Sequence, residues 1–135
     1  MLKHVFRYIS GTVDDRLKFK KSRNGLKLQA YSDSDWASSA GRRSTTGYYF
    51  SLSPVGPALS WKSKKQPTVA LSSCEAEYMA LGLSTQGAIY LERFKDCLSL
   101  CQEPLLLYSD SQSALDLIKN PVNHSRCKHI DILHP

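Results

Sequence analysis

The sequence lacks the features that mark membrane and secreted proteins. No apolar run approaches the roughly 20 residues that a membrane-spanning helix needs. The first residues contain no long apolar stretch followed by small residues, so we expect no secretory signal. Internal repeats and low-complexity tracts are absent as well, and 135 residues are enough for one domain with a single core.

The sequence also has little that suggests a zinc site. Its four cysteines include no Cys-x-x-Cys pair. Cys97 and Cys101 are one helical turn apart, but no histidine lies at a suitable spacing from them. We interpret the cysteines as reduced thiols, which predicts an intracellular protein.

Acidic residues are scarce in the first half of the chain. Residues 1–65 carry 13 Lys and Arg against 4 Asp and Glu, whereas residues 66–135 carry 5 against 8. A basic half of this kind fits a surface that binds a polyanion, although many basic domains have no such partner.

Hydrophobic periodicity predicts three strands, a long helix, a strand and a short helix. A short helix is expected before them over residues 1–11, and the stretch 12–25 is compatible with a strand that ends in the turn Asn24-Gly25. Ser72 and Glu75 have the spacing of a capping box at the start of the long helix. The expected strands are 26–31, 45–52, 58–62 and a buried, parallel strand at 105–108, and the expected short helix is 113–119.

Two aspartates stand where predicted strands end. Asp33 follows an alternating strand and Asp110 follows a wholly apolar one, and the ends of central strands are where mixed sheets bind ligands. Neighbouring acids repel unless a cation lies between them, and their hard oxygen atoms suit Mg²⁺. Glu75 or Glu77, near the start of the long helix, offers a third acid. The competing interpretation is that these acids only cap helices and turns.

Six motifs resemble the ribonuclease H domains of copia-type retrotransposon Pol polyproteins. They are YSDSDW at 31–36, RSTTGY at 43–48, SWKSKKQ at 60–66, TVALSSCEAEYMAL at 68–81, YSDSQSA at 108–114 and NPVNHSRCKHIDI at 120–132. Their order and spacing follow the family over residues 26–132. The resemblance implies an α/β fold with a ribonuclease H-like mixed sheet, in which three antiparallel strands are followed by parallel strands and flanked by helices.

The same resemblance implies two segments and a function. Residues 1–25 correspond to the connection that follows a reverse transcriptase thumb, and residues 26–135 to the ribonuclease H-like domain. The implied function is metal-dependent hydrolysis of the RNA strand of RNA–DNA hybrids during reverse transcription. The implied partners are the hybrid and a covalently linked reverse transcriptase, with no membrane, and the implied location is the cytoplasm, in a virus-like particle.

The family's catalytic acids match Asp33, Glu77 and Asp110, which the resemblance makes ligands of two Mg²⁺ ions, with Mn²⁺ as an alternative. The family's fifth strand and fourth acid come after the point that matches Pro135, and Asp131 is a weak substitute for that acid. We therefore expect a truncated fold whose cleavage activity is weak or absent.

Nucleic-acid contacts are expected from basic and polar residues beside these acids. Five basic side chains are candidates for phosphate contacts, with solvated turns as the alternative: Arg42, Arg43, Lys62, Lys64 and Lys65. Three polar side chains are candidates for contacts to the RNA 2′-hydroxyl, with helix capping as the alternative: Ser34, Ser111 and Gln112. Trp36 and Trp61 can line a bound hybrid, but a tryptophan on a strand is more often part of the core.

Three other functions fit part of the pattern. The first is a nucleic-acid-binding relic with the same fold and no catalysis. The second is a phospho-acceptor domain whose strand-end aspartates bind Mg²⁺, although the expected antiparallel strands argue against it. The third is a DNA-strand-transfer enzyme of the related integrase fold, which requires a different spacing of acids.

Overall fold

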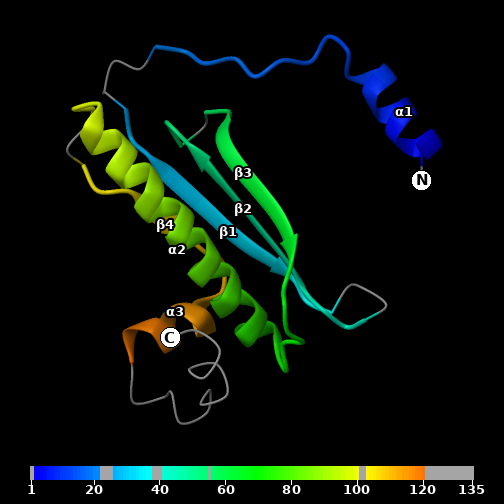
Figure 1. Cartoon of the computed structure of the whole chain (residues 1–135), viewed down its shortest axis with the longest axis vertical. Helices are drawn as coiled ribbons and strands as arrows, with labels where there is room; N and C mark the ends of the chain where they lie inside the picture. The colour runs from blue at the N-terminus through cyan, green and yellow to red at the C-terminus, as the bar shows by residue number, and fades with distance from the viewer. Residues whose placement is uncertain (1, 22–25, 38–40, 55, 101–102, 121–135) are drawn as a thin grey trace.

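The computed structural model describes residues 2–21, 26–37, 41–54, 56–100 and 103–120. These residues form a mixed α/β structure in which a four-stranded sheet lies against a long helix (Figure 1). The helices are α1 (Leu2–Gly11), α2 (Ser73–Cys97) and α3 (Gln112–Lys119). The strands are β1 (Gln29–Asp35), β2 (Thr45–Ser51), β3 (Ala58–Lys65) and β4 (Leu106–Tyr108), in the sheet order β3-β2-β1-β4. The predicted order of three strands, helix, strand and helix is confirmed.

The first three strands form the expected antiparallel meander, but β1 and β3 run further than predicted. Pairing between β1 and β2 continues to Asp35 opposite Thr45, and pairing between β2 and β3 continues to Lys65. Backbone hydrogen bonds hold a strand whatever its side chains, so pairing outlasts the alternating pattern. Asp33 therefore lies inside β1 and not after it. The strand considered within residues 12–25 is not formed by residues 15–21.

Strand β4 pairs in parallel with β1, as predicted, through the register Tyr31 opposite Tyr108. The prediction that β4 is buried is wrong, because Leu106 is 49% exposed and Tyr108 is 42% exposed. Its apolar run suggested a central strand with covered faces, whereas β4 is the edge strand of the described sheet.

Helix α2 begins at the predicted capping box. Ser72 is the N-cap, and its hydroxyl accepts a hydrogen bond from the Glu75 amide at 3.1 Å. Further along, a Cβ atom added at Gly87 would lie 3.1 Å from the Phe50 ring, so the glycine lets α2 approach β2 closely. The core beneath the helix combines four buried residues with partly buried neighbours: Leu28, Ala30, Phe50 and Ala88, with Tyr48, Leu52, Leu91, Leu105 and Leu107.

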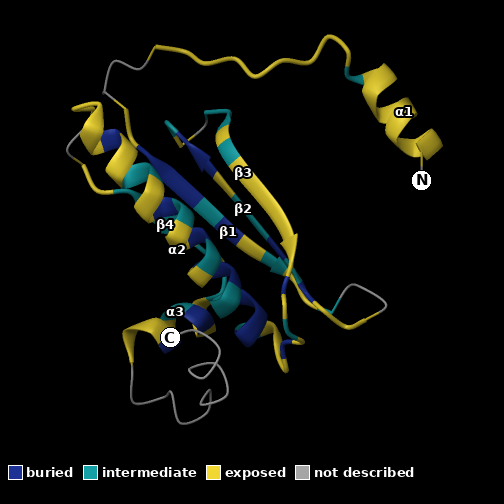
Figure 2. Cartoon of the chain, in the orientation of Figure 1, coloured by how far each residue is buried: buried dark blue, intermediate teal, exposed yellow. Residues whose placement is uncertain are grey.

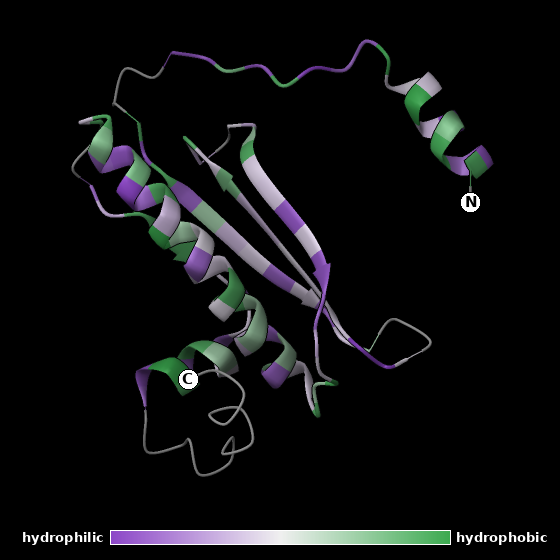
Figure 3. Ribbon diagram, viewed as in Figure 1, coloured by the Kyte–Doolittle hydropathy of each residue, from purple (hydrophilic) through white to green (hydrophobic). Residues whose placement is uncertain are grey.

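The two remaining helices differ in their packing. Helix α3 contacts α2 and buries Ala114 and Leu117. Helix α1 contains no buried residue and lies apart from the sheet, at the end of an extended stretch (Figures 1 and 2). Helix α1 nevertheless includes hydrophobic residues (Figure 3). Their side chains face solvent, among them Phe6 at 65% exposure. No described helix is long and apolar enough to cross a membrane.

The sheet face opposite α2 carries a row of aromatic rings. Tyr31 stacks on Tyr49, with ring centroids 4.9 Å apart, and on Tyr108, with centroids 5.2 Å apart. Trp61 belongs to the same row, because it is the register partner of Tyr49. Trp61 is 67% exposed, so its expected place in the core is wrong.

Candidate metal centre

Strand pairing brings the two predicted aspartates together. Tyr31 of β1 is aligned with Tyr108 of β4 in a parallel register. Asp33 and Asp110 each come two residues later, so the same register carries them to the same end of the sheet. Both residues are exposed, which leaves their carboxylates open to a ligand in solvent.

The third acid comes from the beginning of α2, a helix that contacts β1. Glu77 is only 8% exposed. One carboxylate oxygen from each of Asp33, Glu77 and Asp110 lies within 4.8 Å of the other two. The expected convergence of three acids from three elements is therefore found. Glu75 does not join them, because its carboxylate accepts a hydrogen bond from the Leu71 amide at 2.6 Å.

Ser34 donates hydrogen bonds to two of the three carboxylates. Its hydroxyl donates to Oε1 of Glu77 at 2.6 Å, and its backbone N–H donates to the same oxygen at 2.9 Å. The N–H also lies 2.8 Å from Oδ1 of Asp33 and donates to it as well. Oε2 of Glu77 is buried and has no hydrogen-bond partner among the described residues.

These surroundings disfavour the charged form of Glu77. Burial is the largest cause and raises the pKa of the Glu77 carboxyl above its usual value, and the charges of Asp33 and Asp110 raise it further. The two hydrogen bonds from Ser34 act in the opposite direction and only partly offset the rise. A positive charge close by would favour the ionised form of Glu77.

The donor set fits a divalent cation. All three acids offer carboxylate oxygens, which Mg²⁺ and Mn²⁺ prefer. Two oxygens bound to one Mg²⁺ lie up to about 4.2 Å apart, because each bond measures about 2.1 Å. The separations of up to 4.8 Å can therefore close by small side-chain rotations. A cation would also satisfy the buried Oε2 of Glu77.

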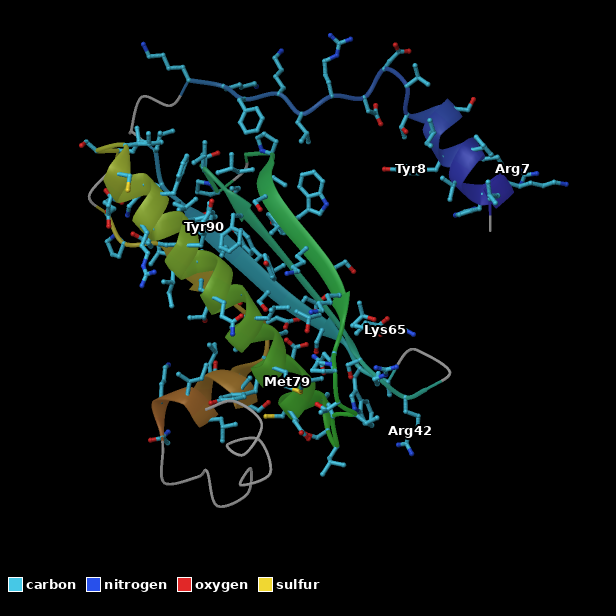
Figure 4. All side chains as sticks on the ribbon, in the orientation of Figure 1. Arg7, Tyr8, Arg42, Lys65, Met79 and Tyr90 are labelled. Atoms are coloured by element: carbon cyan, nitrogen blue, oxygen red, sulfur yellow. The ribbon has the colours of Figure 1, made fainter. Side chains whose placement is uncertain are left out.

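The predicted phosphate contacts lie on and beside β2 and β3. All five basic residues are exposed, and Arg42 and Lys65 lie near the end of the sheet where β3 ends (Figure 4). Lys64 is paired with Thr46, and Thr46 is paired with Ser34. Two strand spacings of about 4.8 Å therefore place the Lys64 backbone roughly 10 Å from that of Ser34.

The predicted 2′-hydroxyl contacts take up hydrogen bonds within the protein. Ser34 binds the acids, and Ser111 is the N-cap of α3, where its hydroxyl accepts from the Ala114 amide at 3.3 Å. Gln112 donates from Nε2 to Oδ1 of Asp116 at 2.7 Å. Asp131, the weak candidate for a fourth acid, lies outside the described residues. The contacts of these side chains with a hybrid stay predictions.

Comparison with known proteins identifies relatives of the chain. No model of a known protein family matches it. It is 46% identical over 132 residues to the retrovirus-related Pol polyprotein from transposon TNT 1-94 of Nicotiana tabacum, covering 97% of this chain and 10% of that protein. It is 41% identical over 133 residues to the Pol polyprotein from transposon RE2 of Arabidopsis thaliana, covering 96% of this chain and 9% of that protein.

A further relative is the secreted RxLR effector protein 161 of Plasmopara viticola, 52% identical over 91 residues, covering 67% of this chain and 62% of that protein. The chain thus spans about a tenth of the length of the Pol polyproteins, but nearly the whole chain matches them. The chain is therefore homologous to a segment of the retrovirus-related Pol polyproteins of transposons.

Proposed function

We propose that this chain is the ribonuclease H segment of a copia-type Pol polyprotein, and that it hydrolyses the RNA strand of RNA–DNA hybrids during reverse transcription. The convergence of Asp33, Glu77 and Asp110 from three separate elements carries the proposal. The antiparallel meander followed by parallel β4 is compatible with a ribonuclease H-like sheet, and it disfavours an all-parallel phospho-acceptor domain.

The three acids would hold divalent cations, Mg²⁺ or Mn²⁺. A pair of such ions supplies Lewis-acid activation of water and neutralises charge at the leaving oxygen of an in-line displacement. The water oxygen becomes bonded to phosphorus, and the bond between phosphorus and the 3′ oxygen breaks. The products are a 3′-hydroxyl, which takes up the proton, and a 5′-phosphate. The protein keeps its three carboxylates in place before substrate arrives, which lowers the cost of reorganisation during reaction.

The basic side chains beside the site would bind the sugar–phosphate backbone. The three lysines of β3, Lys62, Lys64 and Lys65, and the arginines Arg42 and Arg43 are exposed near the end of the sheet that carries the acids. Contacts of this kind hold the hybrid in register without reading its sequence. In the parent polyprotein a covalently linked reverse transcriptase would deliver the hybrid, through the connection formed by residues 1–25, inside a cytoplasmic virus-like particle.

The test is a labelled RNA–DNA hybrid incubated with the chain in Mg²⁺ or Mn²⁺, beside a DNA duplex of the same sequence. We expect the RNA strand alone to be cut, slowly, because the described residues bring together three acids. Asp110→Asn should abolish cleavage, whereas Asp116→Asn, the same change at an exposed position on α3, should not. Cleavage that survives Asp110→Asn would contradict the proposal. Binding of the hybrid without any cleavage would instead identify an inactive nucleic-acid-binding relic.

A further inference from the structure

Ser34 uses its donors inside the protein. Its hydroxyl carries one hydrogen, and that hydrogen goes to Oε1 of Glu77 at 2.6 Å. Its N–H lies between Oε1 of Glu77 at 2.9 Å and Oδ1 of Asp33 at 2.8 Å. Ser34 therefore has no donor left for a substrate hydroxyl, and it joins two acids whose charges repel.

These hydrogen bonds make the two oxygens of Glu77 unequal. Oε1 accepts both donors of Ser34, whereas Oε2 is buried and accepts none from the described residues. A carboxylate held at one oxygen by two donors cannot rotate freely about its last bond. By elimination, Oε2 is the Glu77 oxygen whose capacity to accept is still free for a ligand of the three acids.

We propose that Ser34 is a positioning residue, which fixes the Glu77 carboxylate so that one chosen oxygen is presented to the candidate metal centre. The inference rests on the proposed function, because it requires the three acids to bind a cation. Groups that hydrogen-bond to metal ligands orient them, and their loss typically weakens metal binding about 10–100-fold. Ser34 acts in this way on Glu77 through its hydroxyl, and on Asp33 and Glu77 together through its N–H.

The test measures Mn²⁺ binding through thermal unfolding, without nucleic acid. The melting temperature of the whole chain is recorded against MnCl₂ concentration. The stabilisation grows with the logarithm of the Mn²⁺ concentration above the dissociation constant, so the curve gives that constant. Ser34→Ala removes the hydroxyl and keeps the N–H, and we expect the dissociation constant for Mn²⁺ to rise at least about 10-fold. Ser34→Thr retains the hydroxyl and should stay close to wild type.

Ser32→Ala is the matched control. Ser32 lies two residues earlier on β1, on the same side of the strand, and its hydroxyl is buried with no hydrogen-bond partner among the described residues. Its removal should leave the Mn²⁺ response unchanged. Melting in EDTA separates positioning from support of the fold, because it records the stability that Ser34→Ala loses when no cation is present, independently of the dissociation constant for Mn²⁺.

The outcomes separate this inference from the proposed function. A wild-type protein that Mn²⁺ stabilises, together with an unchanged dissociation constant in Ser34→Ala, would overturn the role of Ser34 and leave the metal centre standing. A Ser34→Ala variant that is destabilised in EDTA but keeps the wild-type dissociation constant for Mn²⁺ would overturn it too, since Ser34 would then only support the fold. A wild-type protein that Mn²⁺ does not stabilise would overturn the metal centre, on which both proposals depend.

Discussion

Replacing Asp110 by Asn should stabilise the metal-free protein and destabilise the protein in saturating Mg²⁺, relative to wild type. In the metal-free protein the three carboxylates lie within 4.8 Å of one another and repel. Two unit charges 4 Å apart repel by about 1 kcal/mol in water and about 4 kcal/mol at the effective dielectric near a protein surface. Asp110 is exposed, so the lower figure applies, and Asp110→Asn should raise the free energy of unfolding in EDTA by about 1 kcal/mol.

Saturating Mg²⁺ should stabilise the wild-type protein more than Asp110→Asn. A ligand present at about 100 times its dissociation constant stabilises the folded state by about 2.7 kcal/mol. For a chain of this size each kcal/mol moves the melting temperature by roughly 3–5 °C, so the wild-type protein should melt about 10 °C higher in Mg²⁺. Asp110→Asn removes one of three ligands and should lose most of this gain.

The expected result is therefore a crossover. Thermal unfolding followed by differential scanning calorimetry should rank Asp110→Asn above wild type in EDTA and below it in Mg²⁺. Asp116→Asn is the control for a lost negative charge, since Asp116 is exposed on α3 and outside the acid cluster. If Asp110→Asn melts lower than wild type in both conditions, or gains as much from Mg²⁺, the reasoning about repulsion and cation binding is wrong.

Three further predictions follow from the same geometry. The pKa of Glu77 is raised in the folded protein. Protonated Glu77 therefore contributes its full stabilisation to the fold at pH values below the usual pKa. This stabilisation is lost as the pH rises through the higher folded-state pKa. Melting in EDTA should therefore decline with pH across that window, and less so in Glu77→Gln. Replacing the three lysines of β3 by Ala should weaken hybrid binding to the same extent for all hybrid sequences. The slope of log affinity against log salt concentration should become shallower by roughly 0.9 for each lost phosphate contact, as measured by anisotropy titrations. Gly47 is paired with Asp33, and among the described residues, its chain neighbours apart, the nearest atom to an added Cβ is the Asp33 carbonyl oxygen at 4.0 Å. Gly47→Val should therefore leave the melting temperature near wild type and reduce hybrid cleavage, by placing a side chain beside the Asp33 carboxylate.

Short-range signals in the sequence were enough to predict much of the fold. The Ser72–Glu75 spacing located the start of α2, because a capping box involves groups only three residues apart. The apolar run before Asp110 indicated a parallel strand, and its pairing with β1 places two aspartates at one end of the sheet. The acid cluster was therefore accessible from the sequence, while the choice of Glu77 over Glu75 came from the family resemblance.

Features that depend on distant residues could not be predicted in this way. Trp61 has a pattern suited to a core strand, but its exposure depends on which sheet face α2 covers. Leu106 is exposed for the same reason, since it lies on the same side of β4 as Tyr108, on the sheet face opposite α2. The hydrogen bond from Ser34 to Glu77 joins residues 43 positions apart, so the sequence suggested only a substrate contact or a helix cap for this serine.

The structure also bears on whether the three acids are ordinary helix and turn caps. The N-cap of α2 is Ser72 and that of α3 is Ser111, so neither helix needs Glu77 or Asp110 to cap its first turn. Asp33 lies inside a paired strand, where no cap exists. Glu77 is buried beside two like charges and leaves one oxygen without a hydrogen-bond partner in the described structure, an arrangement that destabilises the metal-free fold.

A neutral side chain at the position of Glu77 would suit the fold better than a carboxylate does. The variant Glu77→Gln would keep the hydrogen bonds from Ser34 through its amide carbonyl oxygen, and it would remove the repulsion from Asp33 and Asp110. A carboxylate at this position is therefore unfavourable for the fold alone. A bound cation is the physical circumstance in which all three charges become favourable.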